Sequence, residues 1–227
     1  MAEELVIAFD LVGTLLDLSA LDDKFRAEFG GSRVRQEWFA EVQKLMFSIT
    51  AAGGYEGFSD MAETALKIVE ERHQQKPSDG RRKQILQSLR ELPPFSDVKP
   101  ALQRLRSGGF HLIVLTNSTE KAAKQAAESA GLSELFEHIF SAHSVKRLKP
   151  APEPYRMAAK KSSVKASKLL LVAAHSWDVR GASRAGCRTC FVHRPEQVLD
   201  ELTPKPDFVV SDLHELTNQL TRAKKAA

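Results

Sequence analysis

Short apolar runs alternate with amphipathic stretches along most of the chain. Strands are predicted from runs at residues 5–9, 109–115, 138–141, 169–173, 188–192 and 206–210. Stretches with apolar residues every three to four positions predict helices at 99–107, 120–130, 152–161, 179–185 and 213–222. Strands that alternate with helices are typical of a parallel sheet with both faces covered, so the pattern predicts an α/β fold.

The segment after the first strand breaks this alternation. Residues 17–92 are almost wholly helical in pattern, with apolar positions at helical spacing over 22–29, 35–50, 59–72 and 81–92. Glycine pairs and the stretch 76–80 separate these predicted helices. We therefore expect a Rossmann-like core made of residues 1–15 and 93–227, with a four-helix type of cap domain at residues 16–92.

Composition and charge exclude several classes of function. Of 227 residues, 42% are apolar and 27% charged, as in ordinary globular proteins. The net charge of +4 is small and scattered, so no nucleic-acid partner is expected. No apolar stretch approaches the roughly 20 residues of a membrane span. The acidic start runs directly into the first strand and does not resemble a secretory signal, so we expect a cytoplasmic protein without a membrane partner.

Two cysteines stand three residues apart, at Cys187 and Cys190. On a helix start this spacing is typical of redox pairs. Here it falls in a predicted strand, where residues three apart point to opposite faces. Two buried core thiols are the favoured interpretation.

Polar residues with catalytic potential follow the predicted strands. Asp10 comes directly after the first run, and Gly13 supplies a turn there. Because open α/β sheets bind ligands at the carboxyl ends of their strands, Asp10 is a candidate functional carboxylate. Taken alone, it is equally well explained as a helix cap or turn residue.

Three further signals come later in the chain. Thr116-Asn117-Ser118 follows a strand and could hydrogen-bond an anion, although such residues are also common caps. Lys149 precedes a proline turn and could hold a carboxylate ionised, or could be a surface lysine. Asp178 follows another buried strand.

Together these signals resemble the haloacid dehalogenase superfamily. The resemblance rests on Asp10-x-x-Gly13-Thr14, then Ser118 with Thr116, then Lys149-Pro150, then the acidic strand end at Asp178. The order and spacing extend over nearly the whole chain. The superfamily also places a helical cap where residues 16–92 stand. The resemblance implies an enzyme with Asp10 as nucleophile, and it suggests a homodimer.

Within the superfamily, the phosphatases carry a second acid two residues after the nucleophile. Here that position is Val12, and the Gly-Asp pair that helps them hold Mg²⁺ is replaced by Ala173-Ala174. Mg²⁺ needs hard oxygen ligands, so no metal and no other cofactor is expected. The sequence instead resembles the type II 2-haloacid dehalogenases, metal-independent hydrolases whose corresponding motif is similar to His175-Ser176-Trp177-Asp178.

This resemblance implies that Asp10 displaces halide from C2 of a short 2-haloalkanoic acid and forms an ester that water hydrolyses. It further implies that Lys149 orients Asp10, that Asp178 with His175 positions or activates the water, and that Thr14 bonds Asp10. His175 could equally be a neutral, satisfied histidine. The candidates for substrate or halide binding are Val12, Thr116, Asn117, Ser118, Phe39, Trp38, Trp177 and Arg35.

The helical segment departs from the family pattern. Well-known members carry an arginine in the first cap helix, next to a tryptophan, whereas Trp38 here precedes Phe39. Arg35, one turn earlier, could take that role. Trp38 and Phe39 are otherwise explained as packing within the cap.

Two other functions remain open from sequence. One is a hydrolase of the same fold that acts on a phosphate ester or another activated carbon. The other is a non-catalytic relative that kept the fold for binding. Val12 and Ala174 argue against the first, and the set of Asp10, Lys149 and Asp178 argues against the second.

Overall fold

Six parallel strands form a single sheet in the computed structural model, which describes residues 5–31 and 33–226. The strand order is β3-β2-β1-β4-β5-β6. The strands are β1 (Val6–Phe9), β2 (His111–Thr116), β3 (His138–Ser141), β4 (Leu169–Ala173), β5 (Arg188–Val192) and β6 (Phe208–Val210). The order reverses between β1 and β4, and ligands of open α/β sheets bind at such a point.

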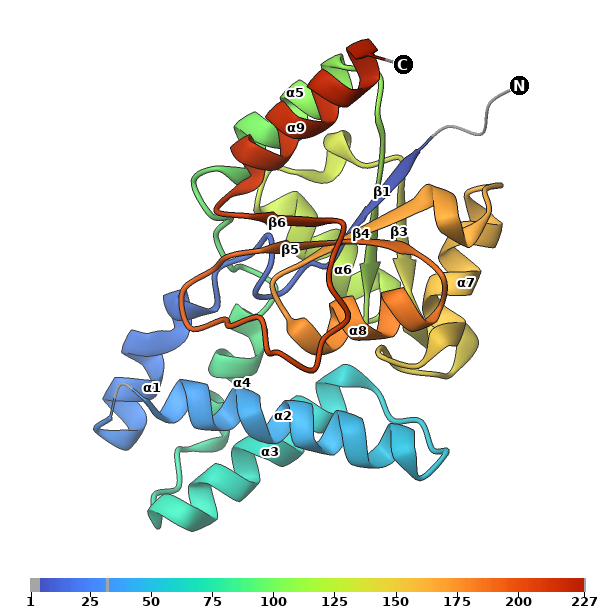
Figure 1. Cartoon of the computed structure of the whole chain (residues 1–227). Coiled ribbons are helices and arrows are strands. Elements are labelled where there is room, and N and C mark those ends of the chain that lie inside the picture. The colour runs from blue at the N-terminus through green and yellow to red at the C-terminus, as the bar shows by residue number, and fades with distance from the viewer. Residues whose placement is uncertain (1–4, 32, 227) are drawn as a thin grey trace.

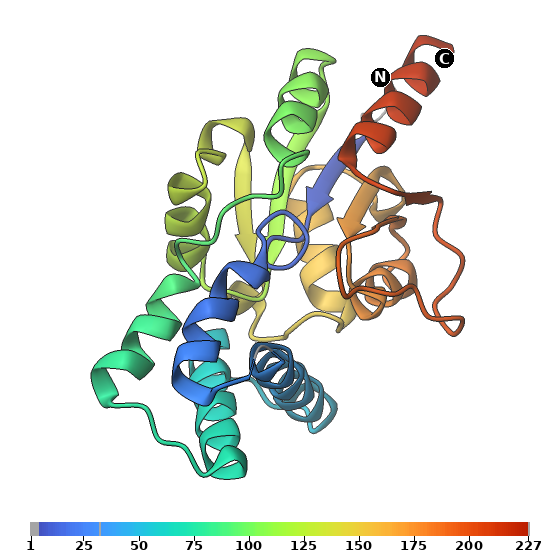
Figure 2. The same cartoon turned by 90° about the vertical axis from the view of Figure 1, so that its left-hand side faces the viewer.

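Helices cover both faces of the sheet (Figures 1 and 2). Side chains of a strand alternate between the faces, so Ile7 and Phe9 pack into one core while Val6 and Ala8 pack into another. One core includes residues of α5 (Val98–Ser107), α6 (Glu120–Ser129) and α9 (Leu213–Ala226); the other includes residues of α7 (Pro152–Lys161) and α8 (Ser176–Arg184).

A separate helical layer lies at the carboxyl ends of the strands (Figure 1). It consists of α1 (Asp22–Phe29), α2 (Val34–Ala51), α3 (Phe58–His73) and α4 (Asp79–Ser88). Short 3-10 helices complete the structure at η1 (Leu18–Leu21), η2 (Ser133–Leu135), η3 (Ala142–Val145) and η4 (Ala166–Lys168). Because this layer faces the strand ends, any ligand bound there lies between the two layers.

The fold class agrees with the sequence prediction, whereas three helix boundaries differ by three residues or more, including the end of α9, which is at Ala226 rather than at residue 222. The fourth helix ends at Ser88 rather than at Leu92. Helix α8 begins at Ser176, three residues before the predicted start at Val179. His175 is therefore the residue that caps α8, and Asp178 lies in its first turn.

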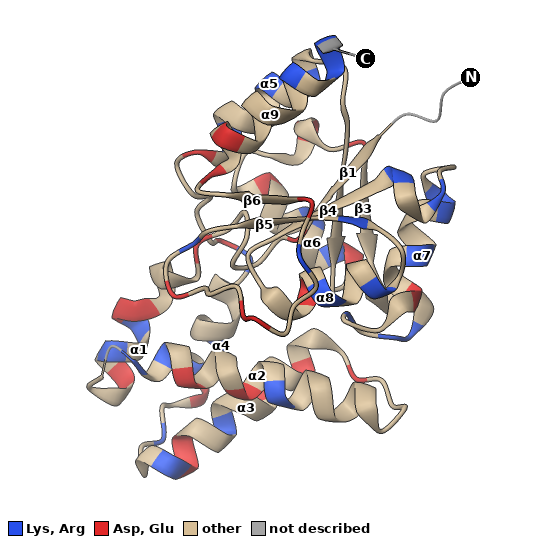
Figure 3. Ribbon diagram, viewed as in Figure 1, with Lys and Arg blue, Asp and Glu red and all other residues tan. Residues whose placement is uncertain are grey.

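Charges of both signs are mixed over the sheet layer and the helical layer (Figure 3). Over the described part of the chain, no helix is long and apolar enough to cross a membrane. Cys187 and Cys190 are both buried and free, in agreement with their interpretation as core thiols.

Candidate active site

The loops that follow β1, β2 and β4 meet beneath the helical layer. Asp10 follows β1 directly, Thr116 ends β2, and His175 lies two residues beyond β4. Strand β1 is paired with both β2 and β4, so the three strand ends are adjacent. This register brings together polar residues that are more than 100 positions apart in the sequence.

Asp10 is the centre of a buried hydrogen-bond network. It is 6% exposed, and its Oδ1 accepts a hydrogen bond from Lys149 Nζ at 2.9 Å. Its Oδ2 accepts from Thr14 Oγ1 at 2.7 Å and lies 3.2 Å from His175 Nδ1. Ionised carboxylates accept hydrogen bonds only, so this set of neighbours is matched to the charged form of Asp10.

Lys149 bridges two carboxylates. Its fully buried ammonium group donates to Asp10 Oδ1, to Asp178 Oδ2 at 2.6 Å and to the carbonyl oxygen of Leu115 at 2.8 Å. These contacts use all three of its donors. The other oxygen of Asp178 accepts from the hydroxyl of Tyr155 at 2.5 Å. Both oxygens of Asp178 are thus engaged within the protein.

The pKa values of these groups follow from burial and from this pairing. Burial raises the pKa of Asp10, but Lys149 and His175 outweigh it and the net pKa is lowered well below the ordinary 3.8. Burial lowers the pKa of Lys149, yet Asp10 and Asp178 together raise it above 10.5. The pKa of Asp178 is raised, because burial and the nearby charge of Asp10 oppose the effect of Lys149. Asp10 is therefore an ionised carboxylate next to a charged lysine.

The turn after Asp10 is shaped by Gly13. Its φ of +80° lies in the left-handed region, where a side chain is strained. A Cβ at this position would also lie 2.9 Å from Cε1 of His175. The turn lets Thr14 reach back to Asp10 while Thr14 Oγ1 accepts from the backbone N–H of Ala174 at 3.0 Å. Gly13 and Thr14 therefore connect the loops of β1 and β4.

A small cavity of about 30 Å³ opens onto Asp10. Its walls combine loops of the sheet with one side of α2 and the start of α3. The lining residues are Asp10, Val12, Phe39, Val42, Gln43, Met46, Phe58, Thr116, Asn117, Ser118, Lys149, His175 and Trp177. Most of the surface that the cavity exposes is apolar, and polar groups lie around the carboxylate of Asp10, as in sites that bind small ligands.

Two buried nitrogen atoms of this cavity's residues have no protein partner. They are Nε2 of His175 and Nε1 of Trp177. The two rings stack with centroids 5.2 Å apart, and Phe39 packs against His175 at 6.0 Å. Buried polar atoms normally find partners, so a group that is left unpaired marks a place where a bound molecule could supply one.

The cavity contains most of the residues that the sequence nominated for it. Val12, Phe39, Thr116, Asn117, Ser118, His175 and Trp177 line it together with Asp10 and Lys149. Asn117 also has a structural contact, because its side chain accepts from the N–H of Lys149 at 2.8 Å and donates to Lys149 O at 3.2 Å. Asp178 reaches the site only through Lys149.

Two other nominated residues, Arg35 and Trp38, are not among those that line the cavity. Arg35 is buried, with its guanidinium bonded to Asp22 at 2.8 Å and to both carboxylate oxygens of Glu196. Trp38 is fully buried in the helical layer, where its Nε1 donates to the carbonyl oxygen of Ala62. These partners fix both side chains away from Asp10.

Sequence reasoning missed several residues of the site. Gln43, Val42 and Met46 come from α2, Phe58 from the start of α3, and Tyr155 from α7. Phe39, Val42, Gln43 and Met46 share one side of a helix by their spacing, which was the available signal. Gln43 is the polar member of this side, whereas Phe39 stands where the family pattern has an arginine.

The carboxylates offer little to a metal ion. Across residues 5–31 and 33–226, no group of three or more His, Cys, Asp or Glu side chains is placed to hold one. The charge between Asp10 and Asp178 is already supplied by Lys149. The Gly-Asp pair that helps the phosphatases hold Mg²⁺ is Ala173-Ala174 here, so that carboxylate is missing.

The chain matches the family model of the haloacid dehalogenase-like hydrolases over residues 5–186. It belongs to this family of hydrolases. This membership confirms the resemblance seen in the sequence. It also agrees with the order of Asp10, Thr116, Lys149 and Asp178 along the fold.

Relatives and solved structures extend the match to nearly the whole chain. (S)-2-haloacid dehalogenase 2 of Pseudomonas sp. (strain CBS-3) is 31% identical over 219 residues, which are 96% of either chain. Haloacetate dehalogenase H-2 of Moraxella sp. (strain B) is 28% identical and covers 90% of this chain and 92% of its own. The crystal structure of the L-2-haloacid dehalogenase RSc1362 superposes with a TM-score of 0.91 at 26% identity, over 97% of this chain and all of that one.

Proposed function

We propose that this hydrolase is a metal-independent dehalogenase that displaces halide from C2 of a short 2-haloalkanoic acid through an aspartyl ester. The observation that carries the proposal is Asp10, held ionised by Lys149 and open to a small apolar cavity. Similarity to 2-haloacid and haloacetate dehalogenases supports the substrate class.

In the first step, a carboxylate oxygen of Asp10 attacks C2 of the substrate. A carbon–oxygen bond forms, the carbon–halogen bond breaks, and the halide leaves with the bonding electrons. Lys149 and Thr14 hold Asp10 in one orientation by hydrogen bonds. A fixed nucleophile in a dry, apolar cavity reacts faster because its orientation and desolvation are achieved before the reaction.

In the second step, water attacks the ester carbonyl of Asp10. Since ionised Asp10 only accepts hydrogen bonds, Nδ1 of His175 carries the proton of their 3.2 Å contact. Nε2 of His175 has no partner in the protein, and in a neutral ring it can take a proton from the attacking water. The ester bond breaks, one hydrogen of the water ends on the hydroxyl of the departing 2-hydroxy acid, the other passes to solvent through His175, and Asp10 is restored as a carboxylate. Asp178 acts through Lys149, because both of its oxygens are already bonded.

The anionic groups of the substrate need hydrogen-bond donors in the cavity. The indole N–H of Trp177 has no partner in the protein, so it is available to a carboxylate or a leaving halide. Gln43 and Ser118 also line the cavity and add neutral donors. Asn117 is bonded to the backbone of Lys149, so we assign it to positioning that lysine.

The other predictions fit this proposal. Residues 16–92 act as the cap that covers Asp10, and residues 1–15 and 93–227 form the catalytic core. Phosphate-ester hydrolysis is less well supported, because Val12 offers no acid or base two residues after Asp10. A purely binding role does not require a nucleophile next to a buried lysine. The cytoplasmic location and a homodimer remain predictions.

Halide release tests the proposal directly. Purified protein is incubated with chloroacetate or (S)-2-chloropropionate in the presence of EDTA, and free halide is measured. Release that persists in EDTA and disappears in Asp10→Asn is expected. Absence of release from every short haloacid, or turnover of p-nitrophenyl phosphate that depends on Mg²⁺ and on Asp10, would contradict it.

A second experiment separates the two steps. In His175→Gln we expect the first step to survive and ester hydrolysis to slow. Halide release should then stop after one equivalent per enzyme, and mass spectrometry of the digested protein should detect the substrate's carboxyalkyl group on the peptide that contains Asp10. Full multiple turnover in His175→Gln would show that a group other than His175 accepts the proton of the attacking water.

A further inference from the structure

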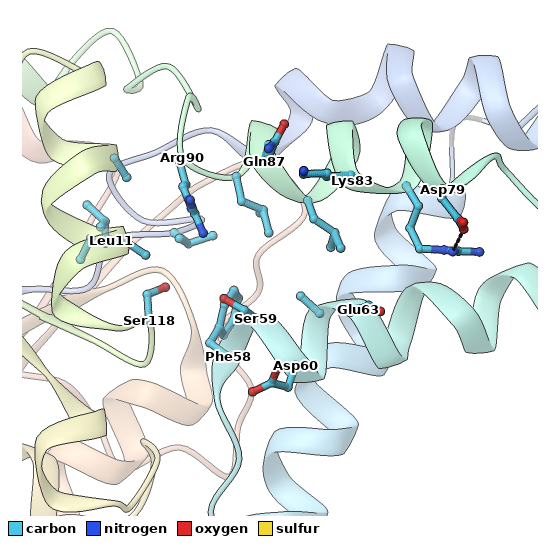
Figure 4. Close-up of a pocket in the computed structure, with 18 residues that line it drawn as sticks. Leu11, Phe58, Ser59, Asp60, Glu63, Asp79, Lys83, Gln87, Arg90 and Ser118 are labelled. Carbon is cyan, nitrogen blue, oxygen red and sulfur yellow. Dashed lines mark hydrogen bonds and ion pairs between the residues drawn. The ribbon is translucent and has the colours of Figure 1, made fainter.

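A second, much larger cleft lies beside the catalytic cavity. It has a volume of about 580 Å³, within the range of roughly 300–1,000 Å³ in which small organic ligands bind. Its walls come from α3 and α4 of the helical layer and from α6 of the sheet layer. Figure 4 shows it extending from Leu11 and Ser118 at one end to Asp79 at the other.

The two spaces share part of their walls. Val12, Phe58 and Ser118 line both the catalytic cavity and the cleft. Val12 is two residues from Asp10, so the shared wall lies close to the reacting carboxylate. A molecule whose C2 atom is held at Asp10 can therefore extend past these side chains into the cleft.

Half of the side chains that line the cleft are apolar, and six are charged: Asp60, Glu63, Asp79, Arg82, Lys83 and Arg90. Leu11, Leu86 and Leu89 face α6, which contributes the small side chains of Ala122, Ala123 and Ala126. Leu86, Leu89 and Ala122 are only partly buried, so apolar surface remains open to a ligand. Charged groups such as Lys83 and Arg90 also line the cleft, but both are exposed. This combination suits a hydrocarbon chain better than a second charged group near the site.

The size of the catalytic cavity points in the same direction. At about 30 Å³, the volume of about one water molecule, it is too small for an alkyl substituent in addition to the groups of a substrate that meet Asp10. A longer substituent on C2 has no room there. We infer that the cleft is a subsite for the alkyl substituent of medium-chain 2-haloalkanoic acids, which enters past Val12, Phe58 and Ser118. This inference rests on the proposed dehalogenation and names a longer substrate for the same site.

A chain-length comparison tests the inference. Halide release in EDTA is measured for 2-bromopropionate and 2-bromooctanoate with the wild-type protein and with Ala122→Trp. Tryptophan at position 122 fills the cleft without touching the catalytic cavity, which Ala122 does not line. We expect kcat/KM for 2-bromooctanoate to fall by about tenfold or more, and that for 2-bromopropionate to change by less than about threefold.

Two further variants complete the design. Leu86→Trp narrows the cleft from α4 and should also lower kcat/KM for 2-bromooctanoate selectively. Because Leu86 is not on α6, a local folding defect in α6 cannot explain this second loss. Gln125→Trp places the same ring on an exposed position of α6 outside the cleft and should leave both substrates unaffected. Activity on 2-bromopropionate reports that each variant is folded.

The possible outcomes distinguish failure of the alkyl subsite from failure of the proposed dehalogenation. Wild-type release of bromide from 2-bromopropionate but not from 2-bromooctanoate overturns the alkyl subsite and leaves the dehalogenase standing. Equal losses of kcat/KM for both substrates in Ala122→Trp overturn the inference as well. They would indicate that every substrate passes through the cleft to reach Asp10, rather than that the cleft binds the alkyl substituent. Failure of the wild type with both substrates and with chloroacetate overturns the proposed function together with the inference.

Discussion

Lys149 sets the charge balance of the site at the scale of single residues. It is fully buried and forms ion pairs with both Asp10 and Asp178. With both carboxylates ionised, the three groups carry a net charge of −1, whereas the two carboxylates alone would carry −2. A buried ion pair adds little stability relative to an apolar pair, but the loss of one partner is costly because it leaves charge unpaired. Lys149 therefore matters both for the stability of the fold and for the ionised state of Asp10.

Replacement of Lys149 should lower both stability and activity, whereas replacement of an exposed lysine should lower neither. Lys149→Met leaves two buried carboxylates without a cation, and we expect a loss of stability of about 3–5 kcal/mol together with loss of halide release. Chemical denaturation and the chloroacetate assay measure both. Lys160→Met, at an exposed position, is the control and should change neither. A fully active Lys149→Met protein would contradict the assigned role.

The lowered pKa of Asp10 gives a prediction for acid conditions. Because the pKa lies below the ordinary 3.8, Asp10 stays ionised throughout mildly acidic solution. The stabilisation that goes with a lowered carboxylate pKa is present above the ordinary value and is lost as the pH falls through the lowered one. The first-turnover rate of halide release should therefore vary by less than about twofold between about pH 5 and pH 7. A steep decline of that rate toward about pH 5 would show that Asp10 is protonated there.

At the scale of elements, the site depends on how closely α8 approaches the loop of Lys149 and Pro150. Gly181 makes this approach possible. A Cβ at this position would lie 2.6 Å from the hydroxyl oxygen of Tyr155 and 2.7 Å from both Cβ and the carbonyl oxygen of Pro150. The same Tyr155 hydroxyl donates to Asp178. Gly181 thus lets α8 pack closely enough for Asp178 to bond Lys149. Tyr155 of α7 is then the second hydrogen-bond partner of Asp178.

Gly181→Ala should cost stability despite the better helix propensity of alanine. The clash costs about 1–3 kcal/mol, whereas the propensity gain is at most about 1 kcal/mol. We expect a lower melting temperature and reduced halide release, since Tyr155 must move away from Asp178. Gly80→Ala in α4 is the matched control, because its Cβ would have no neighbour closer than 4.0 Å. It should be neutral or stabilising; similar losses in both variants would contradict the packing argument.

The sequence predicts the strand-end half of the site better than the helical half. Asp10, Thr116 and Asp178 follow apolar runs, and parallel strands place their ends at one edge of the sheet whatever the loops do. Gln43 and Phe58 reach the cavity only because α2 and α3 pack in a particular orientation over that edge. Local periodicity does not fix this orientation. The sequence therefore could not show that the side chain of Arg35 bonds to Asp22 and Glu196 instead of lining the cavity.

At the scale of the whole molecule, the candidate site lies between the sheet layer and the helical layer. The sheet layer supplies the charged groups, and the helical layer supplies Phe39, Gln43 and Phe58. Arg35 connects the two: it lies on α2, and its guanidinium bonds both oxygens of Glu196, which follows β5. Asp22, at the start of α1, holds the same guanidinium through Nε. This arginine therefore fixes the position of α2 above the strand ends.

Loss of this link should change stability and substrate affinity more than the chemical step. Arg35 is buried, but Asp22 and Glu196 are each about one-third exposed, so we expect Arg35→Met to cost about 1–3 kcal/mol rather than the full cost of a buried pair. KM for chloroacetate should rise while kcat stays within about threefold, because Arg35 does not line the cavity. Arg26→Met, which removes an exposed pair with Asp23, is the control and should be close to neutral. A large loss of kcat at unchanged KM in Arg35→Met would instead place this arginine in the chemical step.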